Sequence, residues 1–415
     1  MEQRRDPVAP TFDLLVVVLA FAIPVYRKWV SIVAPLLIVL WLVRPGLRPR
    51  LRAMLHDPLV VASLAFIALN LLSATWSSDP AEGLSYAAKY RYLLLVPALA
   101  TTVGPRLARL TVVSFLAGTG LSLLISFGAA MGFLAVGNLS AANPAPGMAH
   151  LDYSLLLAVA GVVLLNRIVY QSARRSRLLH GLLLVAVVAG LLVNIGRSGQ
   201  LAFVVAVLVM GPVWAASRLG SRRAVVAASG AVLAVVALAY AAVPRFGHGI
   251  DSGLSELSAS VHGARYDTNV GKRVAGAVVA GDLFQRRPFL GTGVGGAMPA
   301  FRELVVDRYP DLSGDVYWFP HLHSQYLQVG VELGILGLAL LATLLVSLGR
   351  RRDPDAERRH LGLAISLVYA LGFVADPFLH KQLPLVAFSL FAGLLAAPVC
   401  RVEAEEHRED HAREG

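Results

Sequence analysis

The chain has little of what soluble proteins depend on. Only 15% of its 415 residues are charged, against about a quarter in a typical soluble domain, and its mean hydropathy is +0.65. A single cysteine, Cys400, excludes an intrachain disulfide and says little about redox compartment. The net charge of +11 does not indicate a nucleic-acid partner, because the basic residues cluster in short loops between apolar runs, where they are typical topology signals.

Long apolar runs dominate the remainder. Runs of roughly 17 to 25 residues are long enough to cross a ~30 Å hydrocarbon core as helices, and they predict an all-α polytopic membrane protein of about twelve spans. The expected spans are 11–26, 29–44, 58–75, 86–102, 110–136, 151–169, 179–196, 199–216, 224–243, 322–348, 360–378 and 383–400. The chain then divides into nine spans within 1–243, a polar loop with short helices at 244–321, three spans within 322–400, and a charged, disordered tail at 401–415.

The loops between these spans differ in charge. When alternate loops are assigned to opposite faces, the arginines gather on one face, whereas loops 76–85 and 137–150 on the other face contain neither lysine nor arginine. The positive-inside rule places the arginine-rich face and both termini in the cytoplasm. The polar segment 244–321 therefore lies on the outer, non-cytoplasmic side. The outer face of a bacterial inner membrane has no ready supply of ATP or nucleotide sugars.

One glycine-rich stretch fits a nucleotide-binding pattern by its letters alone. Gly291-Thr-Gly293-Val-Gly-Gly296 matches the dinucleotide fingerprint, but no strand–turn–helix unit surrounds it. Bends in the loop are the better interpretation of these glycines.

A short turn, Asn194-Ile-Gly-Arg197-Ser-Gly-Gln200, joins the seventh and eighth spans at the outer face. A cation at or just below the membrane surface is costly and usually has a partner or a task. Arg197 can snorkel to the interface, or it can bind an anion such as phosphate through its two-pronged guanidinium. We take Arg197 as an anion ligand and Gln200 as a further candidate for substrate binding.

The outer segment carries more cations. Arg265, Lys272 and Arg273 precede an apolar stretch, and residues 269–284 have the pattern of an amphipathic helix that lies on a bilayer surface. A pyrophosphate needs more than one cation, so Arg273 is the natural second ligand beside Arg197. Arg265 and Lys272 are candidates for substrate binding.

Two histidines stand where the chain re-enters the membrane. His321 and His323, at i and i+2 without a matching carboxylate cluster, give a weak metal signal. Proton transfer fits better, because a neutral imidazole near physiological pH can take a proton from a hydroxyl nucleophile. We take His323 as the catalytic residue and His321 as a candidate for substrate binding. The alternative is that either residue only starts a helix and bonds to local backbone.

Other charged residues lie at the same face. Lys89 and Arg91 open the fourth span and can either join the anion site or snorkel. Asp376, His380 and Lys381 form the turn between the last two spans, where they can pair with one another.

Together these motifs resemble the bacterial O-antigen ligase family. The resemblance lies in the Gly-Arg-Ser-Gly turn, in Arg273 followed by Arg287-Pro-Phe-Leu-Gly291-Thr-Gly-Val-Gly, and in His321-Leu-His323-Ser-Gln-Tyr-Leu-Gln-Val-Gly-Val-Glu332-Leu-Gly. It covers about 194–338. The family commonly has asparagine where this chain has Ser324.

The resemblance implies a GT-C-like membrane fold and an enzyme with a periplasmic active site. Such an enzyme moves O-antigen polysaccharide from undecaprenyl pyrophosphate to lipid A–core, without a metal or other cofactor, in the bacterial inner membrane. The resemblance also implies that Arg197 and Arg273 bind the pyrophosphate and that His323 is the base. An O-antigen polymerase with the same donor is the nearest alternative. A lipid-linked oligosaccharide transporter would instead have repeat symmetry and charges deep within several spans.

Overall fold

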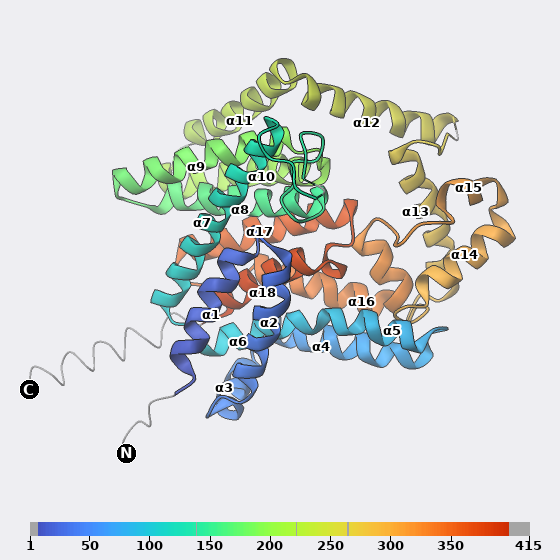
Figure 1. Cartoon of the computed structure of the whole chain (residues 1–415), viewed down its shortest axis with the longest axis horizontal. Coiled ribbons are helices and arrows are strands. Elements are labelled where there is room, and N and C mark those ends of the chain that lie inside the picture. The colour runs from blue at the N-terminus through green and yellow to red at the C-terminus, as the bar shows by residue number, and fades with distance from the viewer. Residues whose placement is uncertain (1–6, 138, 221, 264, 398–415) are drawn as a thin grey trace, which may run out of the picture. The chain divides into compact units, whose positions relative to one another are not determined.

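The computed structural model describes residues 7–137, 139–220, 222–263 and 265–397 (Figure 1). Within these ranges every regular element is a helix, and an isolated bridge between Val136 and Leu139 is the only strand-like pairing. The expected tail at 401–415 lies outside them.

The described helices confirm an all-α polytopic membrane protein. Seven are long and apolar enough to cross a membrane, or eight if the sharply bent pair Arg27–Leu42 and Leu47–Met54 is one span. Other predicted spans coincide with shorter helices. The 86–102 span, for example, is divided into a 3₁₀ segment, Ala88–Leu94, and an eight-residue helix, Leu95–Thr102. Twelve spans and a GT-C-like arrangement therefore stay predictions.

The chain forms two compact units. The first contains residues up to Leu64, from Tyr92 to Met148, and from Gln382 onward. Its helices are α1 (Ala9–Ala22), α2 (Arg27–Leu42), α3 (Leu47–Met54), α6 (Leu95–Thr102), α7 (Pro105–Ala130) and α18 (Gln382–Ala396). Small residues allow close helix contacts here, as is common in membranes. A Cβ at Gly118 of α7 would lie 2.3 Å from the Phe21 carbonyl oxygen on α1.

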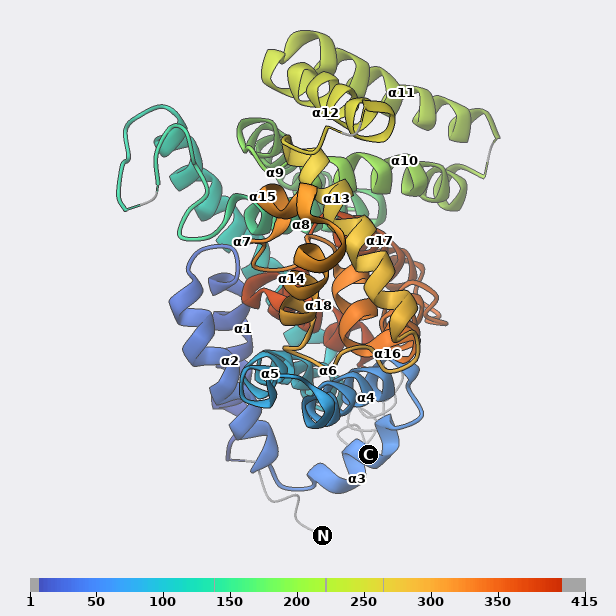
Figure 2. The same cartoon turned by 90° about the vertical axis from the view of Figure 1, so that its right-hand side faces the viewer.

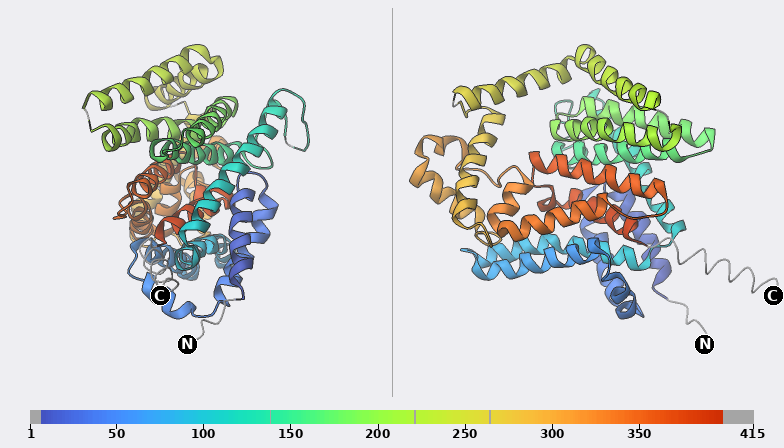
Figure 3. Two further views of the ribbon diagram at one scale, coloured as in Figure 1. Left: turned by 90° about the vertical axis from the view of Figure 1, so that its left-hand side faces the viewer. Right: turned by 180° about the vertical axis from the view of Figure 1, so that it is seen from behind.

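The second unit, Ala65–Arg91 and Ala149–Lys381, contains every residue of the predicted site. Helix α4 (Pro58–Ser73) leads into it. Its other elements are η1 (Ala74–Trp76), α5 (Pro80–Ala87), η2 (Ala88–Leu94), α8 (His150–Tyr170), α9 (Arg174–Val193), α10 (Arg197–Leu219), α11 (Arg222–Ala242), α12 (Pro244–Gly263), α13 (Asn269–Arg286), α14 (Ala297–Arg308), η3 (Pro310–Leu312), α15 (Ser313–Val316), α16 (Gln325–Gly349), α17 (Ala356–Ala375) and η4 (Phe378–His380). Helix α8 is almost entirely buried, and α9, α10 and α17 pack around it (Figure 3).

The segment predicted as a polar loop is mostly helical. Helix α13 confirms the predicted helix at 269–284, but its surroundings differ from the expectation. Its apolar face, including Ala275 and Val279, is buried in a core with Phe301 of α14 and Leu322 (Figure 2). The protein's own helices therefore cover the face that the sequence pattern assigned to a bilayer surface.

The glycine-rich stretch is a strap across a broken helix. Gly291, Gly293 and Gly295 all have positive φ, which confirms bends rather than a nucleotide cradle. Helix α16 breaks at Gly334 (φ 63°), which frees carbonyls that an unbroken helix would use. The backbone N–H of Thr292 donates to Val331 at 2.8 Å, and that of Gly293 donates to Glu332 at 2.9 Å. The strap thereby satisfies backbone groups that a membrane interior could not solvate.

Candidate active site

The two histidines lie together in the turn before α16, with ring centroids 4.5 Å apart. Ser324 caps the helix by accepting from the Leu327 N–H, and its hydroxyl donates to the Phe373 carbonyl of α17. Among the described residues His323 is the only non-glycine with positive φ, at 50°. Such a backbone is uncommon for a side-chain-bearing residue and clusters at functional sites, so the turn holds this imidazole in a costly, fixed position.

A buried ionic network lies next to these rings. His321 Nε2 is 3.8 Å from Oδ1 of Asp376, whose side chain is fully buried. Lys381 pairs with Asp376 and also reaches Asp152 of α8, 3.4 Å away. This confirms the predicted pairing of Lys381 with Asp376. The network links three segments: the histidine turn, the turn after α17 and the start of α8.

Both imidazoles are held neutral near pH 7. Burial lowers the pKa of His321 to about 4, although Asp376 opposes that shift. Burial also lowers the pKa of His323, and the positive charge of Arg273 lowers it further. His321 Nδ1 accepts the backbone N–H of His323 at 3.3 Å, so in the neutral ring Nε2 carries the proton and faces Asp376. A neutral His323 is the form that can accept a proton.

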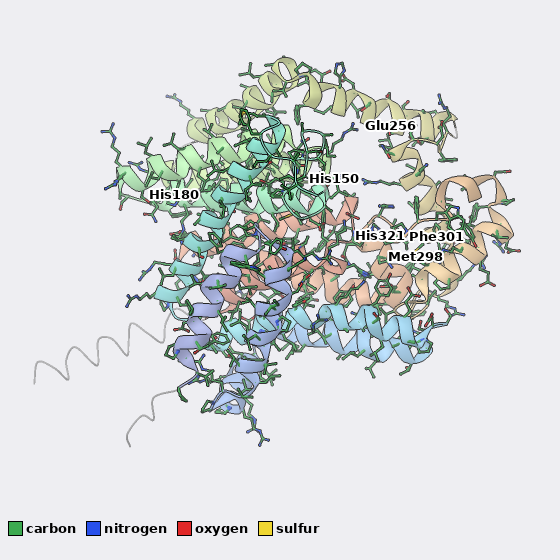
Figure 4. All side chains as sticks on the ribbon, viewed as in Figure 1. His150, His180, Glu256, Met298, Phe301 and His321 are labelled. Carbon is green, nitrogen blue, oxygen red and sulfur yellow. The ribbon has the colours of Figure 1, made fainter. Side chains whose placement is uncertain are left out.

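Arg273 is held by the start of α13. Thr268 caps the helix by accepting from the Gly271 N–H, and the Glu256 carboxylate of α12 accepts from the Val270 N–H at 3.0 Å (Figure 4). Both oxygens satisfy N–H groups that the first turn leaves without helical partners. The half-buried Arg273 is close enough to His323 to influence its titration.

Arg197 is the first residue of α10 and is exposed. The turn before it packs on α8, because a Cβ at Gly196 would lie 2.5 Å from the His150 carbonyl, and one at Gly199 would be 2.2 Å from the Ser154 carbonyl (Figure 4). Only glycine permits this approach. Helix α8 therefore carries the Arg197 turn at the same end as Asp152, which contacts Lys381. A Cβ at Gly249 of α12 would lie 3.4 Å from Arg197 Nε.

The other predicted binding residues have local partners. Gln200 donates to the carbonyls of Leu191 and Asn194, which makes it a clamp for the turn. Arg91 donates to the Ala88 carbonyl, and Lys89 lies over the Tyr86 ring, 3.8 Å from its centroid.

Two further candidates lie near the start of α13. Arg265 pairs with Asp267 at 3.5 Å, and Lys272 is partly exposed on the first turn of the helix. The structure thus brings Arg273 to the histidine turn and leaves Arg265 outside it.

Sequence reasoning missed two acidic residues beside the site. Asp152 lies in the first turn of α8, and Glu332 of α16 is 2% exposed and lies 3.5 Å from His380 Nε2. The available signal was a carboxylate within each apolar span, which is costly there and therefore informative.

Three side chains have the composition of a metal site. The ligand atoms of His321, His323 and Asp376 lie within 4.8 Å of one another. The sequence expectation of two histidines without a carboxylate is thus incomplete, because folding adds Asp376. Lys381, however, already pairs with Oδ2 of that carboxylate, and its positive charge opposes a second cation at the neighbouring Oδ1.

The fold and this site define a polytopic helical membrane protein with an imidazole whose pKa is lowered by a guanidinium. Residues 182–342 match the protein family described as O-antigen ligase, which confirms the resemblance indicated by the motifs. The matched stretch includes Arg197, Arg273 and His323. Members of this family are O-antigen ligases and polymerases, glycosyltransferase-like enzymes. No curated protein matches the chain.

Proposed function

We propose that this protein is an O-antigen ligase of the bacterial inner membrane. It transfers O-antigen polysaccharide from undecaprenyl pyrophosphate to a sugar hydroxyl of lipid A–core. The site faces the periplasm and both termini are cytoplasmic, in keeping with the arginine-rich loops on the opposite face. The single observation that carries the proposal is the left-handed backbone conformation that fixes His323, where burial and the charge of Arg273 lower the pKa of its imidazole.

The reaction is a single displacement at the anomeric carbon. His323 takes the proton of the acceptor hydroxyl as its oxygen attacks that carbon. The new glycosidic C–O bond forms while the C–O bond to pyrophosphate breaks, and the bonding electrons leave with undecaprenyl pyrophosphate. One displacement inverts the anomeric configuration, so a product that retains the donor's configuration contradicts this mechanism.

Arg197 and Arg273 stabilise the departing pyrophosphate. Neither makes an ion pair or hydrogen bond with another described residue, so both guanidiniums are available to an anion. Positive charge aimed at a developing anion is among the largest contributions to catalysis. Pyrophosphate is already a good leaving group, and the two arginines take the part that a metal ion has in many nucleotide-sugar transferases. Lys381 supports the metal-independent course, because its charge lies at Oδ2 of Asp376 and repels a cation at Oδ1.

The network around Asp376 holds the base. His321 receives the backbone N–H of His323, and Asp376 lies opposite the other nitrogen of His321. These residues fix the ring that does the chemistry, and we give them no direct contact with substrate.

A lipopolysaccharide gel from cells that lack the protein tests the proposal. We expect bare lipid A–core, accumulation of the lipid-linked polymer, and rescue by the wild type but not by His323→Ala. His262→Ala is the matched control, because His262 is an exposed histidine that bonds locally to Ser258. A core that carries one repeat unit identifies a polymerase instead. An unchanged ladder contradicts both enzymes and favours a transporter.

A further inference from the structure

A second feature of the outer segment lies beyond the histidine turn. An open pocket of about 560 Å³ lies between the residues that precede α13 and the end of α14. Its volume is within the range typical of small-molecule sites, roughly 300 to 1,000 Å³. The polar residues that line it are Arg265, Tyr266, Asp267, Arg308, Tyr309 and Asp311.

The charges of this pocket cancel. Two arginines face two aspartates in its lining, and Arg265 pairs with Asp267 at 3.5 Å. Arg308 also has a partner, Asp282 of α13, at 3.7 Å. A pyrophosphate would gain little attraction here, in contrast to the cations Lys272 and Arg273 further along α13. Carboxylate acceptors and guanidinium donors in balance suit a neutral ligand that is rich in hydroxyl groups.

The two tyrosines complete this chemistry. Tyr266 and Tyr309 are partly buried and pack against the core of α13 and α14, which limits their freedom. The Tyr309 hydroxyl also donates to Asp282 at 3.5 Å. A tyrosine ring offers an apolar face and a polar end, and sugars likewise combine apolar C–H surfaces with hydroxyls.

The pocket and Arg273, the proposed pyrophosphate-binding residue, lie a short distance apart along α13. Tyr266 and Asp267 immediately precede the Thr268 cap of α13, and Arg273 is on its second turn. With a rise of about 1.5 Å per residue, roughly 6 Å of helix separates Asn269 from Arg273. A glycan whose first sugar is bound to pyrophosphate at Arg273 can therefore extend to the pocket.

We infer that this pocket binds neutral sugar residues of a glycan substrate. The inference rests on the proposed function for the identity of the glycan. The sugars can belong to the lipid-linked donor or to the core acceptor, and the chemistry of recognition is shared. The pocket would then set which saccharide the enzyme accepts, while Arg273 and His323 perform a transfer that does not depend on the sugar.

Direct binding tests this without requiring transfer. The probes are two soluble oligosaccharides released from the lipopolysaccharide of the source cells, one from the O-antigen and one from the core, measured by saturation-transfer NMR on the purified full-length protein. We expect saturable binding of one of them. Asp311→Ala should weaken it about tenfold, as loss of hydrogen bonds to a charged group predicts. Tyr266→Leu, which keeps apolar volume against the core, should weaken it as well.

The matched control is Asp307→Ala, because Asp307 is exposed on the same helix end but does not line the pocket. Inorganic pyrophosphate provides the opposite test. Its binding should be lost in Arg273→Gln and kept in Asp311→Ala.

The inference is overturned if the wild type binds neither oligosaccharide, or if Asp311→Ala and Tyr266→Leu bind as well as Asp307→Ala. Which oligosaccharide binds identifies the donor or the acceptor as the source. Failure of the ligase proposal has a different signature, because cells without the protein would then show a normal lipopolysaccharide ladder or a core that carries one repeat unit.

Discussion

Five arginines, Arg197, Arg265, Arg273, Arg286 and Arg308, can be compared by their partners. Arg265, Arg286 and Arg308 each lie within 4 Å of an aspartate carboxylate, at 3.5, 3.2 and 3.7 Å. Arg197 and Arg273 have no such partner among the described residues. A paired guanidinium is already neutralised and contributes to local structure, whereas an unpaired one attracts an anion. On the proposed function, partners rather than residue type distinguish the binding arginines from the structural ones among these five.

The sharpest test replaces one member of each group. Arg273→Ala should lower kcat for transfer by about 10²–10³, the usual effect of removing one stabiliser of a developing anion. Arg286→Ala removes the same side chain from the same helix and should change kcat less than about threefold, because exposed ion pairs contribute little. Transfer rates of the two purified variants decide the matter. Equal losses would remove the distinction between the groups.

A milder change asks whether charge alone is enough. Arg273→Lys keeps the positive charge but loses the planar fork that can hold two phosphate oxygens at once. We expect about a tenfold loss of kcat, between the wild type and Arg273→Ala. A fully active lysine variant would show that Arg273 acts only as a point charge. Arg286→Lys serves as the control.

The pH dependence of activity distinguishes the effects of Asp376 and Arg273 on the pKa of His323. Because the pKa of His323 is lowered, activity should be constant near pH 7 and fall only as pH drops through that pKa, below the ordinary value of about 6.5. Asp376 raises this pKa, so Asp376→Asn should move the acid limb to lower pH. Arg273 lowers it, so the residual activity of Arg273→Gln should show the limb at higher pH. Shifts of both variants in one direction would exclude His323 as the titrating group.

The smallest effect concerns backbone strain. His323 has a positive φ, which costs an L-residue roughly 1–2 kcal/mol and costs glycine almost nothing. His323→Gly should therefore be about 1 kcal/mol more stable than His323→Ala, after allowance for the greater flexibility of unfolded glycine. Thermal unfolding of both inactive variants in detergent measures the difference. An alanine variant as stable as the glycine variant would show that the turn relaxes freely.

Local pattern was enough to predict much of the fold. The long apolar runs identified the membrane helices, and the amphipathic spacing at 269–284 identified α13. What covers α13 could not be predicted, because Phe301 and Leu322 reach it only through tertiary packing. The predicted span at 86–102 failed as one helix for a related reason: hydropathy counts residues and does not register the 3₁₀ segment at Ala88–Leu94.

The site was predictable where a residue type is itself costly. Arg197 and the histidines could be singled out because ionisable residues are costly where apolar spans enter the membrane. Gln200 stays a prediction as a substrate contact, and only the folded turn shows that its amide donates to the carbonyls of Leu191 and Asn194. Asp152 contacts Lys381 across more than two hundred residues of chain, a pairing that no local pattern encodes.

The break in α16 also ties activity to the order of synthesis. The strap that donates hydrogen bonds to the carbonyls of Val331 and Glu332 precedes α16 in the chain and is synthesised first. It also packs on Ser73, whose hydroxyl accepts the Val294 N–H at 3.1 Å. A nascent chain that has emerged only as far as the strap can bind Ser73 but not yet the carbonyls of α16, and an inserted α16 without the strap exposes polar backbone to lipid. Helix insertion and strap docking must therefore finish together. On the proposed function, the histidine turn at the start of that helix can act only after the strap has docked.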